Sequence, residues 1–243
     1  MTEPRTENPA TSTPEVTEAP IVRSGYLYWV FKVILTPILT VAFRPHIEGL
    51  TNVPKRGSAL LACNHTSYMD WLFLPLVVRT RRISFLAKME YFTRRGLRGR
   101  AQAYFFSATG QVPVDRAGAH ASQGALLTAT RLLREGRLVG VFPEGTRTRD
   151  GRLNRGRTGV ARMAAATGAP VIPCATVGTY AIAPPGAKLP RPQKIEVKFG
   201  SPMPPISSDP SAEELRSWTD ELMARICVLS GQEYSGVDAV GKA

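Results

Sequence analysis

The segment NHTSYMD at positions 64–70 places a histidine and an aspartate five residues apart, directly after the apolar run 58–63. On one continuous helix His65 and Asp70 would lie about 140° apart, because each residue turns about 100°. The pair therefore requires His65 in a loop and Asp70 in the first turn of a following helix. Asp70 could then accept a hydrogen bond from Nδ1–H of His65, which leaves Nε2 free to take a proton from a hydroxyl group. A capping aspartate beside an unrelated histidine is the alternative for so short a pattern.

Cys63, two residues before the histidine, is a rival nucleophile. It ends an apolar run, where a cysteine is more often an inert, small hydrophobic side chain. The three cysteines of the chain are far apart and odd in number, which excludes a disulfide scaffold and a cysteine zinc site and favours a reducing compartment. The three histidines are also scattered, with His46 and His120 expected at the surface, so no metal site is predicted.

A second polar segment, GQVPVDR at 110–116, ends in Asp115 and Arg116 directly after a strand-like VPV. An arginine in this place could bind an anion, and the alternative is a surface turn that carries a salt bridge. The segment lacks the glycine pattern of a phosphate-binding loop or of a dinucleotide fold. The same is true of the third polar segment, so nucleotide hydrolysis and NAD chemistry are excluded.

The third polar segment, VFPEGTRTRDGRL at 141–153, follows a buried apolar run. Gly145 allows a tight turn, and Arg147 offers a planar fork that suits phosphate oxygens. A buried Glu144 could hold such an arginine or bond a substrate hydroxyl. A second surface turn with salt bridges is again the alternative.

Short apolar runs and helical stretches must position these groups. Buried strands are predicted at 58–63, 83–87, 138–142, 170–178 and 194–199, and helices at 120–135, 157–167 and 211–229. Ser211 and Glu214 form a capping-box pattern, and Gly136 is an expected C-cap. Strands separated by helices predict an α/β fold whose largely parallel sheet is covered by helices on both faces.

The N-terminal region has two parts. Residues 1–21 are rich in Thr, Pro and Glu and predict a disordered acidic tail, whereas residues 22–46 are mostly apolar. Within 26–43, Pro37 predicts a kinked or divided helix, and the apolar stretch after Lys32 is about half of the ~20 residues that a spanning helix needs. A helical pair lying in the membrane interface is favoured over a buried core helix and over a true span.

The charge of the chain predicts an anionic partner. Its 243 residues carry 31 Lys plus Arg against 19 Asp plus Glu, a net charge of +12. Bases concentrate in residues 79–100 (eight, against one acid) and 131–162 (nine, against three acids). A nucleic-acid partner is disfavoured because no recognised binding module appears. With 43% hydrophobic residues, the composition excludes both a polytopic membrane protein and a mainly disordered one.

Taken in order, NHTSYMD, GQVPVDR, FPEGTRT and PVIPCATVGT resemble the four blocks of the glycerophospholipid acyltransferase superfamily, which includes the lysophosphatidic acid acyltransferases. The resemblance runs from about residue 47 to 200 and implies an α/β sandwich around a mixed sheet, with an N-terminal helical segment that meets the membrane. It implies His65 as general base and Asp70 as its orienting partner. It assigns the acyl-donor site to Pro173. It assigns substrate-phosphate binding to Arg116, Glu144, Gly145, Thr146 and Arg147.

The resemblance divides the chain into the tail 1–21, the membrane-interface segment 22–46, an acyltransferase domain 47–230 and a flexible tail 231–243. The expected reaction transfers a fatty acyl group from acyl-CoA or acyl carrier protein, as co-substrate, to the sn-2 hydroxyl of 1-acylglycerol-3-phosphate. No nucleophilic side chain, cofactor or metal is required, because the hydroxyl can attack the thioester directly. The expected location is the cytoplasmic face of the cell membrane, as a peripheral or monotopic protein.

Two alternatives remain at this stage. The same chemistry could act on another lysophospholipid or on a glycolipid, or the chain could be a non-catalytic membrane or nucleic-acid binding protein.

Overall fold

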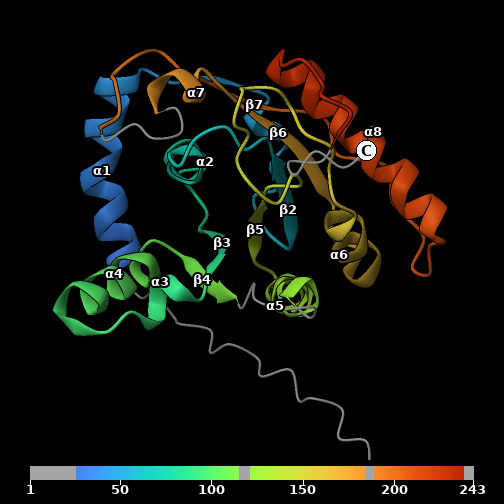
Figure 1. The fold of residues 1–243 in the computed structure, drawn as a ribbon, viewed down its shortest axis with the longest axis horizontal. Helices are drawn as coiled ribbons and strands as arrows, with labels where there is room; N and C mark the ends of the chain where they lie inside the picture. Colours follow the sequence, from blue (N-terminus) through green and yellow to red (C-terminus); the bar gives the residue numbers. More distant parts are fainter. Residues whose placement is uncertain (1–25, 115–120, 184–188, 238–243) are drawn as a thin grey trace, which may run out of the picture.

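A computed structural model describes residues 26–114, 121–183 and 189–237 of the chain (Figure 1). Its seven strands form one sheet in the order β1-β7-β6-β2-β5-β3-β4. The strands are β1 (His46–Glu48), β2 (Ala59–Cys63), β3 (Ile83–Lys88), β4 (Gln111–Val114), β5 (Leu138–Val141), β6 (Val171–Val177) and β7 (Glu196–Phe199). Neighbours in this sheet are parallel except β6 and β7, which are antiparallel. The mixed, mostly parallel α/β sheet expected from the sequence is therefore confirmed.

Helices cover both faces of this sheet. The longer ones are α1 (Leu27–Phe43), α2 (Asp70–Val77), α4 (Gly96–Ala108), α5 (Ala121–Arg134), α6 (Gly159–Thr167) and α8 (Ala212–Ser230). The short ones are α3 (Glu90–Thr93), α7 (Thr179–Ile182) and the 3-10 turn Leu50–Asn52. Figure 1 shows α1 and α2 on one side of the sheet and α6 and α8 on the other.

The central strand β2 shows why the strands of this sheet could be predicted from the sequence. All five of its residues are buried. Ala59, Leu61 and Cys63 belong to the core that includes α2, whereas Leu60 and Ala62 belong to the core beneath α6 and α8. A strand that is buried on both faces has no polar positions, so it appears as a continuous apolar run.

Local signals place the helix ends. The hydroxyl of Ser211 caps α8 by accepting from the N–H of Glu214 at 3.0 Å. The carboxylate of Glu214 accepts from the N–H of Ser207, not from that of Ser211, so only half of the capping box forms. Gly136 and Gly168 have φ of +75° and +64° after α5 and α6, the left-handed conformation that ends many helices.

The N-terminal helix differs from the expected pair, because α1 is one helix with Pro37 inside it. Its two ends are fixed by the buried side chains Tyr28 and Phe43, whereas Val33 and Val41 between them are 72% and 78% exposed. This pattern also excludes a helix buried all round. None of the helices in the described ranges has the length and hydropathy needed to cross a membrane. The predicted tail 1–21 and residues 22–25 lie outside the described residues.

The segment that follows α8 is also different from the expected flexible tail. Residues 231–237 pair with the loop around Leu153, where the N–H of Leu153 donates to the carbonyl of Glu233 and the N–H of Ser235 donates to the carbonyl of Leu153, both at 2.9 Å. Tyr234 and Leu153 form a parallel bridge. The sequence of this segment is polar, and its conformation is held by hydrogen bonds to a loop about 80 residues earlier in the chain. Residues 238–243 lie outside the described part.

Candidate active site

His65 and Asp70 form a hydrogen-bonded pair at the end of β2. His65 lies in the loop after the strand and Asp70 is the first residue of α2, with 2.9 Å between Nδ1 and Oδ2. The side chain of Asp70 is fully buried, whereas that of His65 is 17% exposed. The buried carboxylate fixes Nδ1 as the protonated nitrogen, and the partly exposed ring can meet a substrate.

The loop between the two residues holds the carboxylate in place. Oδ2 of Asp70 also accepts from the backbone N–H groups of Thr66 and Ser67, each at 2.8 Å. Its other oxygen, Oδ1, accepts from the hydroxyl of Thr176 on β6 at 3.2 Å. The carboxylate thus has partners from the loop and from a neighbouring strand, and its position does not depend on the histidine alone.

The ring of His65 is held on its face by Phe142. The two rings are stacked, with centroids 3.9 Å apart and planes inclined by 13°. Within the described ranges no partner is hydrogen-bonded to Nε2 of His65, which is therefore the nitrogen available for proton transfer. Phe142 is the first residue of the FPEGTR segment, so the third motif confines the ring that the first motif supplies.

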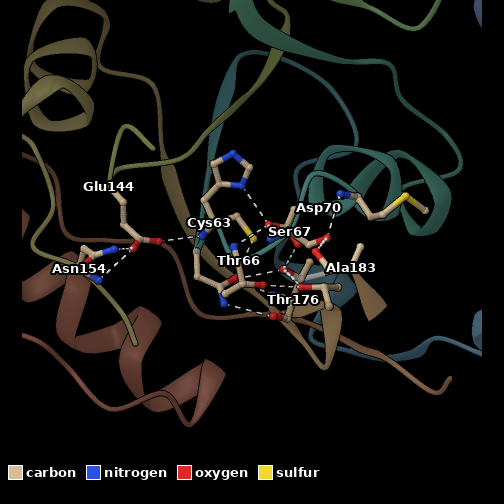
Figure 2. Close-up of polar contacts among 12 residues, drawn as sticks. Cys63, Thr66, Ser67, Asp70, Glu144, Asn154, Thr176 and Ala183 are labelled. Atoms are coloured by element: carbon tan, nitrogen blue, oxygen red, sulfur yellow. Dashed lines mark hydrogen bonds and ion pairs between the residues drawn. The ribbon is translucent and has the colours of Figure 1, made fainter. Parts of the chain in front are cut away.

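Glu144 is placed differently from the expected phosphate-facing position. It is 1% exposed, and its Oε1 accepts from the backbone N–H of His65 at 2.8 Å. Its Oε2 accepts from both the backbone N–H and the side-chain amide of Asn154, each at 2.9 Å. Burial raises the pKa of Glu144 to about 7, although these donors act in the opposite direction. We therefore assign Glu144 to holding the loop of His65, because neither oxygen is open to a substrate (Figure 2).

The remainder of the third motif lies at the surface beside this loop. Gly145 has φ of +76°, and its N–H donates to the carbonyl of Phe142 at 3.0 Å, which closes a tight turn. Thr146 and Arg147 are exposed after this turn. The N–H of Thr148 then donates to the carbonyl of His65 at 2.9 Å. The turn that carries Arg147 is thus bonded to the backbone of His65 on both sides.

Two residues that the sequence reasoning gave no role connect the strands at this point. Asn64 is 1% exposed; its Oδ1 accepts from the backbone N–H of Thr176 at 2.8 Å, and its Nδ2 donates to the Thr176 carbonyl at 3.1 Å. Asn64 and Thr176 both lie inside the four motifs that resemble those of the acyltransferase superfamily. Asn64 directly precedes His65 in the first motif, and Thr176 lies in the fourth. Their position in those motifs was the only signal for them. Figure 2 shows Glu144 and Asn154 on one side of the loop, with Asp70 and Thr176 on the other.

The other candidate residues are less closely connected to the pair. Pro173 is buried within β6, opposite Ala62 of β2, and a Cβ at Gly200 would lie 3.5 Å from its ring. Thr176 is the fourth-block residue that contacts Asp70, and the donor-site role of Pro173 stays a prediction.

Arg116 lies outside the described residues. Among those described, no three His, Cys, Asp or Glu side chains gather as a metal site, and the expected absence of a metal stays a prediction.

Cys63 does not act as the rival nucleophile. Its side chain is fully buried, with its thiol beside Oδ1 of Asn64 at 3.4 Å. Burial, the neighbouring Cys174 and the Asp70 carboxylate all raise the pKa of Cys63. A thiolate is the reactive form of cysteine, and this environment disfavours it.

Comparison with known proteins identifies the family of this fold and site. Residues 44–177 match the Acyltransferase family. The chain is 31% identical over 195 residues to the 1-acyl-sn-glycerol-3-phosphate acyltransferase of Bacillus subtilis (strain 168), an alignment that covers 79% of this chain and 91% of that protein. It is 32% identical over 147 residues to chloroplastic LPAT1 of Arabidopsis thaliana, covering 60% of this chain and 39% of that longer protein.

A solved structure gives the same result. The crystal structure of the 1-acyl-sn-glycerophosphate (LPA) acyltransferase PlsC from Thermotoga maritima superimposes with a TM-score of 0.64 at 29% identity. The superposition covers 83% of this chain and 78% of that one. The resemblance of the four motifs is thus confirmed by sequence and by fold. The chain belongs to the acyltransferase family, and it is an acyltransferase of the kind that these relatives represent.

Proposed function

We propose that the protein transfers a fatty acyl group from a thioester, acyl-CoA or acyl carrier protein, to the sn-2 hydroxyl of 1-acylglycerol-3-phosphate, which gives phosphatidic acid. The observation that carries the proposal is the pair of His65 and Asp70, with 2.9 Å between Nδ1 and Oδ2 and Nε2 left available. The activity of the relatives from Bacillus subtilis and Thermotoga maritima supports the choice of acceptor.

The reaction needs one proton acceptor and no covalent enzyme intermediate. Nε2 of His65 takes the proton of the acceptor hydroxyl while its oxygen attacks the thioester carbonyl. Asp70 stabilises the imidazolium that forms, because its carboxylate bonds to Nδ1–H. When the tetrahedral intermediate collapses, the C–S bond breaks and the departing thiolate receives the proton from His65. The products are the new ester and a free thiol.

Recognition of the acceptor phosphate is assigned to the exposed part of the third motif. Arg147 and Thr146 follow the Gly145 turn, which is bonded to the backbone of His65 through its flanking residues. A phosphate bound there would hold the sn-2 hydroxyl of the same molecule near the histidine, because the turn and the histidine form one unit. Arg116 of the second motif is proposed as a further phosphate ligand, and Pro173 as part of the site for the acyl donor.

The proposed location is the cytoplasmic face of the cell membrane, with the protein attached peripherally or monotopically. Support comes from α1, where Val33, Ile34, Ile38 and Val41 are each more than half exposed. Its Lys32 is partly buried and donates to the carbonyl of Val78 at 2.6 Å, so its charge faces the protein. Exposed arginines lie on the neighbouring helix. Helix α1 packs against α4, where Arg98 and Arg100 are exposed.

The proposal is tested by purified enzyme, a panel of lysophospholipid and glycolipid acceptors, and acyl-CoA or acylated carrier protein as donor. We expect 1-acylglycerol-3-phosphate to give the highest kcat/KM and His65→Ala to abolish turnover. His46→Ala is the matched control, because His46 is an exposed histidine on β1. Normal turnover by His65→Ala would overturn the mechanism, and preference for another acceptor would overturn the substrate.

A further inference from the structure

The segment after α8 returns to the loops that surround the active site. Besides the two backbone hydrogen bonds of Leu153 described above, the N–H of Arg155 donates to the carbonyl of Val237 at 2.8 Å. The backbone of residues 153–155 is therefore joined to the backbone of residues 233–237 by three hydrogen bonds. Asn154, in the middle of this stretch, is the residue that holds Oε2 of Glu144. Through Glu144 this stretch is connected to the backbone N–H of His65.

Gln232 makes a second and shorter connection. Its Oε1 accepts from the side-chain amide of Asn64 at 2.7 Å, and its Nε2 donates to the carbonyl of Gly151 at 2.7 Å. Both ends of one side chain are thus used, one on the loop of the first motif and the other on the loop of the third. Gly231, which ends α8 with φ of +67°, turns the chain so that Gln232 can reach these loops.

The contact with Asn64 is the critical one, because Asn64 directly precedes His65. The buried amide of Asn64 has two N–H groups, which donate to the carbonyl of Thr176 and to Gln232. Without Gln232 one buried N–H would have no acceptor in this arrangement, and such a group turns to find one. A rotation of the Asn64 amide would displace the start of the loop that carries the histidine.

From these contacts we infer that Gln232 is a positioning residue for acyl transfer. By joining Asn64 to Gly151 it fixes the loop of His65 relative to the loop of Arg147, the two groups that must act on one acceptor molecule. The inference rests on the proposed function for its choice of substrate. It gives the segment 231–237 a part in catalysis, although that segment lies outside the four motifs.

The test compares Gln232→Met with wild-type enzyme. Methionine has a similar length and volume but neither hydrogen bond, so the side chain is kept and the connection is lost. We expect kcat to fall about tenfold or more, as small displacements of reacting groups do, while KM for 1-acylglycerol-3-phosphate changes less than about twofold. Gln123→Met is the matched control, because Gln123 is exposed on α5. It should retain wild-type kcat.

A second variant separates positioning from folding. Gln232→Glu keeps an acceptor for Asn64 but cannot donate to the carbonyl of Gly151, so we expect its kcat to lie between wild type and Gln232→Met. Melting curves establish that each variant is folded at the assay temperature. Wild-type kcat in folded Gln232→Met, or in Gln232→Glu if the methionine variant does not fold, would overturn the inference even if the melting temperature falls.

Failure of the proposed function has a different signature. If wild-type enzyme uses another lysophospholipid better than 1-acylglycerol-3-phosphate, the proposed acceptor is wrong. The same variants are then compared on that better acceptor. A loss of kcat in Gln232→Met supports the positioning role there, and unchanged kcat overturns it.

Discussion

His65 donates its backbone N–H to the buried carboxylate of Glu144 at 2.8 Å, although the two residues are 79 positions apart. They follow β2 and β5, which are neighbouring parallel strands, so the sheet brings the first and third motifs together. The acidic residue of the third motif thus holds the histidine of the first by its main chain. A change in Glu144 is therefore expected to act on the position of His65, the proposed general base.

The pH dependence of stability reports the burial of Glu144. Its pKa is raised from 4.5 to about 7 by burial, so the folded protein binds this proton more tightly than the unfolded chain does. The resulting contribution to stability is fully present below about pH 4.5 and is lost as the pH rises through about 7. At about 1.4 kcal/mol for each unit of pKa, the loss is on the order of 3 kcal/mol.

Glu144→Gln provides the reference for this measurement, because glutamine does not ionise. All other carboxylates are the same in the variant and in the wild-type protein, so their titration cancels in the difference. The free energy of unfolding in urea is measured for both proteins between pH 4.5 and 8. We expect the stability of wild type relative to Glu144→Gln to decrease by about 3 kcal/mol over this range. A difference that does not change with pH would mean that the three N–H donors keep Glu144 ionised throughout.

Replacing Asp70 with asparagine tests the charge on the pair. The amide oxygen can still accept from the N–H groups of Thr66 and Ser67, but a neutral group no longer stabilises the imidazolium. We expect kcat to fall by about 10⁴-fold, the order seen for the equivalent change in other histidine–aspartate pairs. Asp209→Asn, at an exposed loop position, should leave kcat unchanged. Turnover of Asp70→Asn within about threefold of wild type would contradict the assigned role.

The turn at Gly145 can be tested against a matched glycine. Gly145 and Gly168 both have positive φ, so alanine at either position is expected to cost about 1 kcal/mol of stability. Only at Gly145 does the new Cβ also meet a neighbour, the guanidinium Nε of Arg157 at 3.0 Å. We therefore expect Gly145→Ala alone to raise KM for 1-acylglycerol-3-phosphate, by about tenfold, or about 1.4 kcal/mol. Equal KM values in the two variants would place the substrate phosphate elsewhere.

The sequence predicts the local and the fully buried parts of this fold well. The central strands are continuous apolar runs because both faces of the sheet are covered, as at Leu60 and Leu61. The cap of α8 at Ser211 needs only residues within one helical turn, so it too is visible. The hydrogen-bonded pair of His65 and Asp70 could also be predicted from their spacing, because the two residues are only five positions apart.

The parts that the sequence does not predict depend on distant partners. The burial of Glu144 follows from contacts with Asn154 and with His65, and the role of Gln232 follows from a contact with Asn64, 168 residues away. No periodicity or cap marks such contacts in a single sequence. Pro37 suggested a division of the first helix, yet the packing of α1 against α2 and α4 retains a single helix.

The exposed face of α1 carries the last prediction, on membrane attachment. Val33 and Val41 are 72% and 78% exposed. Inserting two such side chains into a bilayer removes their apolar surface from water, which stabilises binding by about 2 kcal/mol. We therefore expect the double change Val33→Ser, Val41→Ser to lower the affinity for phosphatidylcholine–phosphatidylglycerol vesicles at least about tenfold in a sedimentation assay.

Val228→Ser is the control for this double change. Val228 is 85% exposed on α8, on the opposite side of the sheet from α1 in Figure 1, so its replacement should leave vesicle binding unchanged. Raising the salt to about 0.5 M separates the two contributions to wild-type binding, because it shortens the screening length of ~8 Å and weakens the attraction of each arginine for anionic lipid. If salt has no effect but the valine changes release the protein, the apolar face of α1 acts alone. If the double variant binds as wild type does, α1 is not the contact with the membrane.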